Sequence, residues 1–197
     1  MHIIMKIPVL TTRFDSNTWL ENSMYRERNG IQGCIYGSAT KMKGTIPLNV
    51  IVFVIAMNNS SNKIEGISLV RNIAHLDKYY KIYSSGTYNR YVYKSKYHIE
   101  RENLCPDLLN IIDQICFKGK THLKRGIGFT SIPEKLQRTS TYDLEPMIKE
   151  IFLKKFGNHI IDSNNLEAEA EAEASTSEEA EYMNRKKEQQ EQMMRET

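Results

Sequence analysis

The chain has 197 residues and a net charge of +3, from 27 Lys and Arg against 24 Asp and Glu. This length suits one domain of ordinary size with an appendage. The longest apolar run, residues 50–57, falls far short of the roughly 18 residues needed to cross a bilayer. Membrane proteins are therefore excluded, and we expect a soluble protein.

The charge is distributed unevenly along the chain. Residues 1–162 contain 23 Lys and Arg against 14 Asp and Glu, a net charge of +9, whereas residues 163–197 contain 4 against 10, a net charge of −6. The second segment is rich in Glu, Ala, Gln and Lys, which favour helices but bury too little apolar area to form a core. We therefore predict a globular domain over residues 1–162 and a low-complexity acidic tail, disordered or helical, over residues 163–197.

The first predicted elements are a helix and two short strands. Residues 16–28 suit a helix, and Thr18 and Glu21 have the spacing of a capping box at its start. Two extended segments follow at 32–36 and 40–43, separated by a Gly-Ser turn. This part of the chain therefore places a helix ahead of the strands.

Four longer strands are predicted next. Residues 49–57 form a bounded run of β-branched and aromatic residues, typical of a central strand buried on both faces. The five polar residues 58–62 connect it to the alternating run 63–71, which predicts a hairpin. Residues 79–83 and 91–99 indicate two further strands.

Two amphipathic helices complete the predicted domain. One begins at Cys105-Pro106 and ends before Gly119, and the other covers residues 144–156. Five or six strands lie between residues 32 and 99, with helices before and after them. This arrangement predicts an α+β domain with a small, strongly curved, mixed or antiparallel sheet.

Cysteine usage and the first residues indicate the cellular compartment. Cys34, Cys105 and Cys116 are odd in number and form no CxxC pair, which favours an intracellular, reducing compartment. The opening MHIIMKIPVL lacks the length and the cleavage site of a secretory signal. His98 and His122 are too widely spaced from the cysteines for a zinc site, so we expect no metal and no other cofactor.

A tyrosine-rich stretch covers residues 78–99. Seven tyrosines alternate there with five Lys or Arg residues. Aromatic rings beside cations can stack the bases and neutralise the phosphates of a single-stranded nucleic acid. The alternative interpretation is a half-buried strand whose tyrosines pack on the sheet.

A basic, glycine-containing loop covers residues 117–132. Its sequence FKGKTHLKRGIGFTSI could bring backbone amides and cations to a phosphate. Gly119-Lys120-Thr121 resembles the end of a Walker A motif, but Gln114 replaces the first glycine, which excludes an NTPase. A solvated loop with ordinary turn glycines is the alternative.

The sequence offers no assembled catalytic set. Cys34 lies between two glycines and could be a nucleophile, but none of the five histidines can be paired with it as a base. No metalloprotease or serine-hydrolase motif is present. We therefore expect a protein without intrinsic catalysis.

Four motifs carry a resemblance to a known family. GCIYGSATKM, KIEGISLVRN and CFKGKTHLKRGIGF, together with YNRYVY, resemble an uncharacterised family of large eukaryotic DNA viruses such as iridoviruses, over residues 10–140. This implies a site in the host cytoplasm or nucleus, or in the virion. The segment Ile64 to Ile67 is similar to the PUA-like superfamily, with its EVE and YTH domains, which implies a pseudobarrel that binds modified bases. The Arg-Asn turn of EVE domains is absent, so no base-contacting residue is transferred.

The residues and the resemblance together predict a non-catalytic nucleic-acid-binding module for RNA or DNA, with recognition of a modified or flipped base as its specific form. The alternative is a protein-interaction or virion-associated factor whose acidic tail binds a protein partner. The predicted nucleic-acid-binding residues are Tyr36, Tyr88, Arg90, Tyr91, Lys118, Lys120, Lys124 and Arg125.

Overall fold

The computed structural model describes residues 6–161. The chain divides into two compact units, Met1–Lys155 and Phe156–Thr197, and the first contains both sheets and nearly all of the helical residues described below. The described part of the second unit is the short 3-10 helix η3 (Asn158–Ile161). The predicted acidic tail at 163–197 lies outside the described residues, so its character and the boundary at 162 stay predictions.

The first unit is built on an open, mixed sheet of five strands in the order β6-β4-β3-β1-β7. The strands are β1 (Val9–Phe14), β3 (Ile51–Asn58), β4 (Lys63–Arg71), β6 (His98–Glu100) and β7 (Thr130–Ser131). β1 pairs with β3 in parallel, and the other neighbouring pairs are antiparallel. The sheet is uncurled, so the expected strong curvature is not seen and closure into a pseudobarrel stays a prediction.

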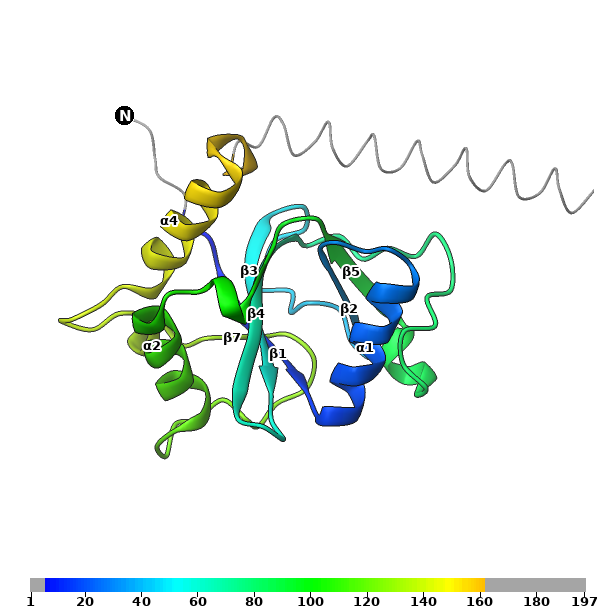
Figure 1. The fold of residues 1–197 in the computed structure, drawn as a ribbon, viewed down its shortest axis with the longest axis horizontal. Coiled ribbons are helices and arrows are strands. Elements are labelled where there is room, and N and C mark those ends of the chain that lie inside the picture. The colour runs from blue at the N-terminus through cyan, green and yellow to red at the C-terminus, as the bar shows by residue number, and fades with distance from the viewer. Residues whose placement is uncertain (1–5, 162–197) are drawn as a thin grey trace, which may run out of the picture. The chain divides into compact units, whose positions relative to one another are not determined.

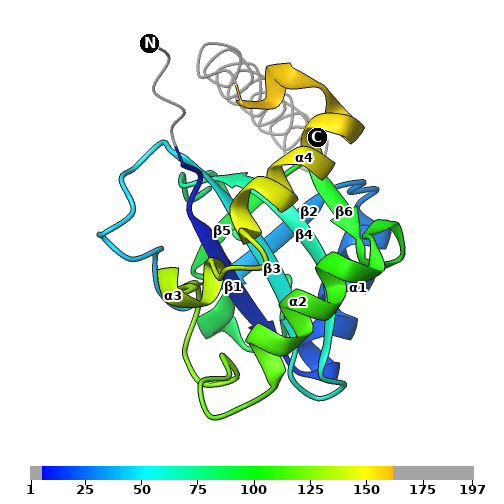
Figure 2. The same ribbon diagram turned by 90° about the vertical axis from the view of Figure 1, so that its left-hand side faces the viewer.

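A second sheet and four α-helices surround the main sheet (Figure 1). β2 (Cys34–Ser38) and β5 (Tyr91–Ser95) form an antiparallel pair. This pair lies with α1 (Ser16–Arg28) on one side of the main sheet, and α2 (Pro106–Phe117) and α4 (Leu144–Phe156) lie on the other, as Figure 2 shows. α3 (Glu134–Gln137) is a single turn that follows β7. These elements confirm the α+β class.

The core fills the space on both faces of β3, as the apolar run in the sequence predicted. Every residue of β3 from Val52 to Asn58 is buried. On one face Val52 and Val54 join a cluster with Tyr36 and Tyr93 of the small sheet. On the other face Phe53 packs against Phe152 of α4, with ring centroids 5.2 Å apart. β3 is therefore a central strand covered on both sides.

The predicted helices are confirmed, with one change at a cap. α1 covers the predicted residues, but its capping box is formed by Asp15 and Thr18 in place of Thr18 and Glu21. Asp15 Oδ1 accepts a hydrogen bond from Thr18 N at 2.8 Å, and Asp15 N donates to Thr18 Oγ1 at 3.0 Å. The bond from Thr18 N and a second from Thr18 Oγ1 to Asp15 Oδ1, at 2.9 Å, lower the pKa of Asp15, which therefore stays ionised at neutral pH. α2 and α4 occupy their predicted positions.

Two predicted strands are wrong, because side chains satisfy their backbone groups. Met42, in the predicted strand 40–43, donates its backbone N–H to the hydroxyl of Tyr93 at 3.0 Å. In the predicted strand 79–83, Asn89 Oδ1 accepts from the backbone N–H groups of Ile82 and Tyr83, and Asn89 Nδ2 donates to Tyr83 O at 2.7 Å. Because side chains already hydrogen-bond these backbone groups, neither segment needs a neighbouring strand to pair with them.

Other differences concern strands that the sequence analysis merged or missed. The predicted strand 91–99 divides at a bend, so that β5 pairs with β2 and β6 pairs with β4 in the main sheet. β1 and β7 were not predicted. β1 is nonetheless the second central strand, because it lies between β3 and β7. All helices among residues 6–161 are too short or too polar to cross a bilayer.

Replacement of Asn89 by Ala should destabilise the first unit. The change leaves two buried N–H groups and one carbonyl without their partner, so we expect the free energy of unfolding to fall by about 2 to 4 kcal/mol. Asn89→Asp keeps the acceptor oxygens and should lose less. Urea denaturation of both variants measures this, and an Asn89→Ala loss below about 0.5 kcal/mol would contradict the role assigned to Asn89.

Truncation after Asp162 should leave a cooperatively folded protein. The removed segment has the composition of a chain that cannot bury a core, so its loss should change the thermal midpoint by no more than a few degrees. Differential scanning calorimetry of the full chain and the truncated chain tests this. Loss of the transition would show that the predicted boundary is wrong.

Candidate nucleic-acid interface

A pocket of about 270 Å³ lies where β1 and β3 end and α1 begins. Small-molecule sites in proteins begin at about 300 Å³, and in open sheets they form beyond the carboxyl ends of parallel strands. The pocket is lined by Thr12, Arg13, Phe14, Asp15, Thr18, Gly37, Asn59, Tyr83, Tyr88, Lys124, Gly126, Ile127 and Gly128. Four parts of the first unit therefore contribute to it. The first is the place where β1 and β3 end and the first turn of α1 begins. The other three are β2, the segment around η1 (Gly86–Asn89), and the basic loop.

The basic loop closes on the end of β1 through Arg13, a residue that the sequence analysis missed. Arg13 Nε donates to Leu123 O at 2.8 Å, and Arg13 NH1 lies 3.0 Å from Thr130 Oγ1 and 3.4 Å from Gly128 O. Burial lowers the pKa of Arg13. Because the usual pKa of arginine lies far above neutral, the guanidinium stays charged. Arg13 therefore fixes the basic loop on both sides of Lys124.

Close approaches explain two of the glycines in this region. A Cβ on Gly126, whose φ is 139°, would lie 3.0 Å from the guanidinium carbon of Arg13. A Cβ on Gly37 would lie 2.3 Å from Tyr88 O. The loop and the η1 segment can approach the strands this closely only because both positions lack a side chain.

Two buried polar atoms of the lining residues have no hydrogen-bond partner within the described structure. They are Arg13 NH2, a donor, and Asn59 Oδ1, an acceptor. The amide nitrogen of Asn59 donates to Lys124 O at 3.1 Å, which ties the β3–β4 turn to the basic loop. An unpaired buried group is costly, so these two atoms mark this end of the first unit as a candidate site.

The structure brings two of the predicted residues, Tyr88 and Lys124, into the lining of this pocket. Tyr88 is 44% exposed, and its ring stands nearly perpendicular to the buried ring of Tyr83, with centroids 6.3 Å apart. Burial raises the pKa of Tyr83 to about 12, so its hydroxyl stays protonated. Tyr88 is thus a partly exposed ring held against the core.

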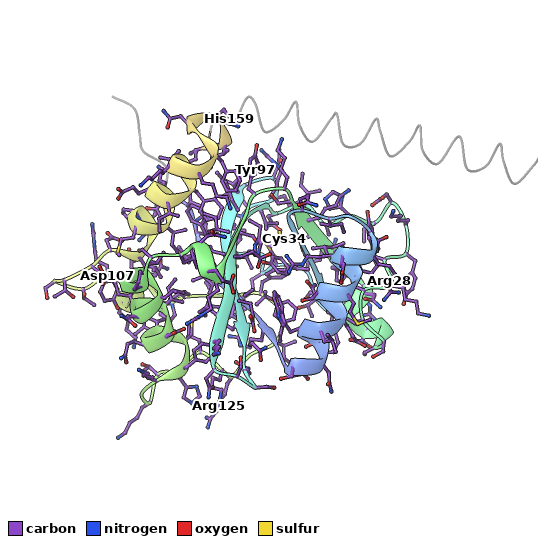
Figure 3. The ribbon with its side chains drawn as sticks, in the orientation of Figure 1. Arg28, Cys34, Tyr97, Asp107, Arg125 and His159 are labelled. Atoms are coloured by element: carbon purple, nitrogen blue, oxygen red, sulfur yellow. The ribbon has the colours of Figure 1, made fainter. Side chains whose placement is uncertain are left out.

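The other predicted residues lie around the pocket or away from it. Arg125 is exposed beside Lys124, at the end of the molecule where the β3–β4 hairpin turns (Figure 3). Lys118 and Lys120 are exposed in the same loop, and Arg90 is exposed after η1. Tyr91 is half-buried, with Lys41 Nζ 5.6 Å from its ring centroid.

The placement of Tyr36 corrects one predicted contact. Its side chain is 2% exposed, and its hydroxyl lies 2.7 Å from the buried Ser68 Oγ. Burial also raises the pKa of Tyr36 well above the usual value. Tyr36 is therefore a core residue and has no free ring face for a base. The sequence pattern of a β-strand does not reveal which of its tyrosines are covered, and for this reason the predicted contact was wrong.

The three cysteines differ in burial. Cys34 is buried, and burial raises the pKa of its thiol to about 11, which keeps the thiol protonated and unreactive. Cys116 is likewise buried, and Cys105 is exposed at the start of α2. No group of three or more potential metal ligands occurs within residues 6–161.

Replacement of Arg13 by Lys should loosen the basic loop. Lysine has one charged head group and cannot reach Leu123 O and Thr130 Oγ1 together, so we expect faster amide exchange across residues 118–130. Hydrogen-exchange mass spectrometry measures the effect. Arg125→Lys is the matched control, because no described hydrogen bond anchors the exposed Arg125. Equal exchange in the two variants would contradict the role of Arg13.

Comparisons of the chain with protein-family models, with curated proteins and with solved structures found no match. The assignment of a function therefore depends on the geometry and chemistry of the pocket and of the basic loop.

Proposed function

We propose that this protein is a non-catalytic nucleic-acid-binding module that accepts a base in the pocket at the ends of β1 and β3. The observation that carries the proposal is that Tyr88 and Lys124, from two separate segments, line the same pocket. An accessible aromatic ring can stack on a base, and a cation next to it can bind the adjoining phosphate. These are the two contacts that a single-stranded nucleic acid requires.

The charge of the loop supports a polyanionic ligand. Residues 117–132 contain four Lys or Arg residues and no Asp or Glu. Lys118, Lys120 and Arg125 are exposed, and none of them forms a described salt bridge. A cluster of exposed cations attracts phosphates over a Debye length of about 8 to 10 Å.

The polar groups of the pocket support a base as the inserted group. A nucleobase edge presents donors and acceptors side by side. The pocket residues offer the unpartnered donor of Arg13, the unpartnered acceptor of Asn59 and the ionised carboxylate of Asp15. A base inside the pocket must be splayed out of a helix, so the proposed ligand is single-stranded or has a flipped base, modified bases included.

The resemblance to PUA-like domains and to a viral family is part of the same proposal. The pseudobarrel and the location in a host cell or virion remain proposals. The acidic tail lies outside the described residues. Binding of a protein partner by this tail becomes the leading proposal for the function if the nucleic-acid proposal fails.

Charge removal and ring removal should have different effects on binding. Replacement of Lys120, Lys124 and Arg125 by Ala should weaken binding to every oligonucleotide and flatten its salt dependence, by about 0.7 to 0.9 in the slope of log K against log salt for each lost phosphate contact. Tyr88→Ala should cost about 1 to 3 kcal/mol with the slope unchanged, because stacking is not electrostatic. Fluorescence anisotropy with single-stranded RNA and DNA at several salt concentrations measures both.

Matched controls separate local from general effects. Lys43, Lys135 and Lys154 are exposed and lie outside the basic loop, so their triple Ala variant removes the same charge from other places. Tyr79 is 66% exposed and does not line the pocket, so Tyr79→Ala is the control for Tyr88. If the loop variant and Tyr88→Ala stay folded and bind both nucleic acids as the parent does, the proposal is wrong.

A further inference from the structure

A chain of polar side chains crosses the interior of the first unit from α1 to β2. Arg26 NH1 donates to Glu100 Oε1 at 3.0 Å, and Glu100 Oε2 lies 3.1 Å from His98 Nε2. His98 Nδ1 is 2.8 Å from Ser68 Oγ, which is 2.7 Å from the hydroxyl of Tyr36. The Nε2 contact is close in distance but falls outside good hydrogen-bond geometry. We call these five residues the relay.

The inner part of the relay is buried, so its hydrogen atoms must be ordered. Ser68 is 0%, Tyr36 2% and His98 6% exposed. His98 and Arg26 lower the pKa of Glu100 to about 2 against the opposing effect of burial, so Glu100 is a carboxylate at neutral pH. A carboxylate next to Nε2 favours a proton on that nitrogen, which leaves Nδ1 as an acceptor.

This tautomer gives the relay one direction. Ser68 donates its hydroxyl proton to His98 Nδ1, and the hydroxyl of Tyr36 then donates to Ser68 Oγ. Loss of the Ser68 hydroxyl would leave His98 Nδ1 and the hydroxyl of Tyr36 without this partner, which is costly in the interior.

The relay resembles the Ser-His-carboxylate set of a hydrolase, but its position excludes that chemistry. Ser68 is fully buried and does not line the described pocket. Cys34, whose thiol also contacts Ser68, is buried as well and stays protonated because burial raises its pKa. A nucleophile must reach its substrate, so the relay has a structural role.

The ring of Tyr36 connects the relay to the pocket. It packs against Phe14, with ring centroids 6.2 Å apart, and against Phe129 at 6.3 Å. Phe14 lines the pocket, and Phe129 directly follows Gly128, which also lines it. Gly37, the residue after Tyr36, is a third lining residue. Tyr36 therefore packs on one lining residue directly and adjoins two others through Phe129 and Gly37.

We infer that Tyr36, Ser68 and His98 are positioning residues for the base pocket, and that the relay holds the pocket wall in its binding geometry. This inference rests on the proposed function.

Tyr36→Phe and Tyr93→Phe form a matched pair of variants. Both remove a buried hydroxyl from the small sheet, and both rings pack on Phe129. The hydroxyl of Tyr93 accepts from Met42 N and is not part of the relay. We expect Tyr36→Phe to weaken oligonucleotide binding at pH 7 by about 2- to 10-fold with the salt slope unchanged, as loss of one hydrogen bond predicts, and Tyr93→Phe to change it by less than 2-fold.

A comparison of affinity with stability separates positioning from a merely structural role. Urea denaturation of Tyr36→Phe and Tyr93→Phe measures the stability that each variant loses, and a positioning role predicts that Tyr36→Phe loses affinity beyond what its loss of stability explains. A Tyr36→Phe protein that binds oligonucleotides as Tyr93→Phe does overturns the inference.

Nitrogen NMR of His98 tests the relay without any nucleic acid. The neutral ring should be the Nε2–H tautomer, and the Nδ1–H tautomer would overturn the proposed direction. Failure of the two parts can thus be distinguished. If only the positioning role of the relay is wrong, Tyr88-dependent binding stays intact. If the parent binds no oligonucleotide, the proposed function is wrong, and the positioning role fails with it even where the tautomer of His98 is as expected.

Discussion

The parallel pairing of β1 with β3 is the constraint on which the rest of the structure depends. Parallel strands cannot be joined by a tight turn, so the chain between them must pass over the sheet, and it does so as α1 and β2. The same pairing brings the carboxyl ends of both strands to one edge. The pocket forms at that edge because α1 leaves from the end of β1 and the β3–β4 turn begins at the end of β3.

Local signals in the sequence predicted the elements that depend on local physics. The hairpin of β3 and β4 and the helices α1, α2 and α4 follow from hydrophobic periodicity, capping residues and turn residues. β1 was missed because VLTTRF mixes apolar and polar residues, and its place between two strands depends on partners far along the chain. The strand expected at 79–83 failed because Asn89 satisfies the backbone there, a contact that no periodicity reveals.

The candidate site was predicted only in outline for a similar reason. Residue type identified Tyr88 and Lys124 as candidates, but it identified Tyr36 as well, which the fold buries. Arg13 was missed because one arginine in a short strand carries no motif, and its importance comes from carbonyls of a loop more than 100 positions later. Asn59 was seen only as a turn residue. Composition predicts the chemistry of a surface, whereas tertiary contacts select the residues that form the site.

The two polar clusters of the first unit differ in a way that bears on function. In the core, Ser68 and Tyr36 complete each other's hydrogen bonds, as burial demands. At the pocket, Arg13 NH2 and Asn59 Oδ1 are buried without partners among the described residues, at a cost of about 1 to 3 kcal/mol for each unpaired group. Under the proposed function, a base that presents an acceptor to one and a donor to the other would recover that cost on binding, whereas an apolar ligand would recover none of it.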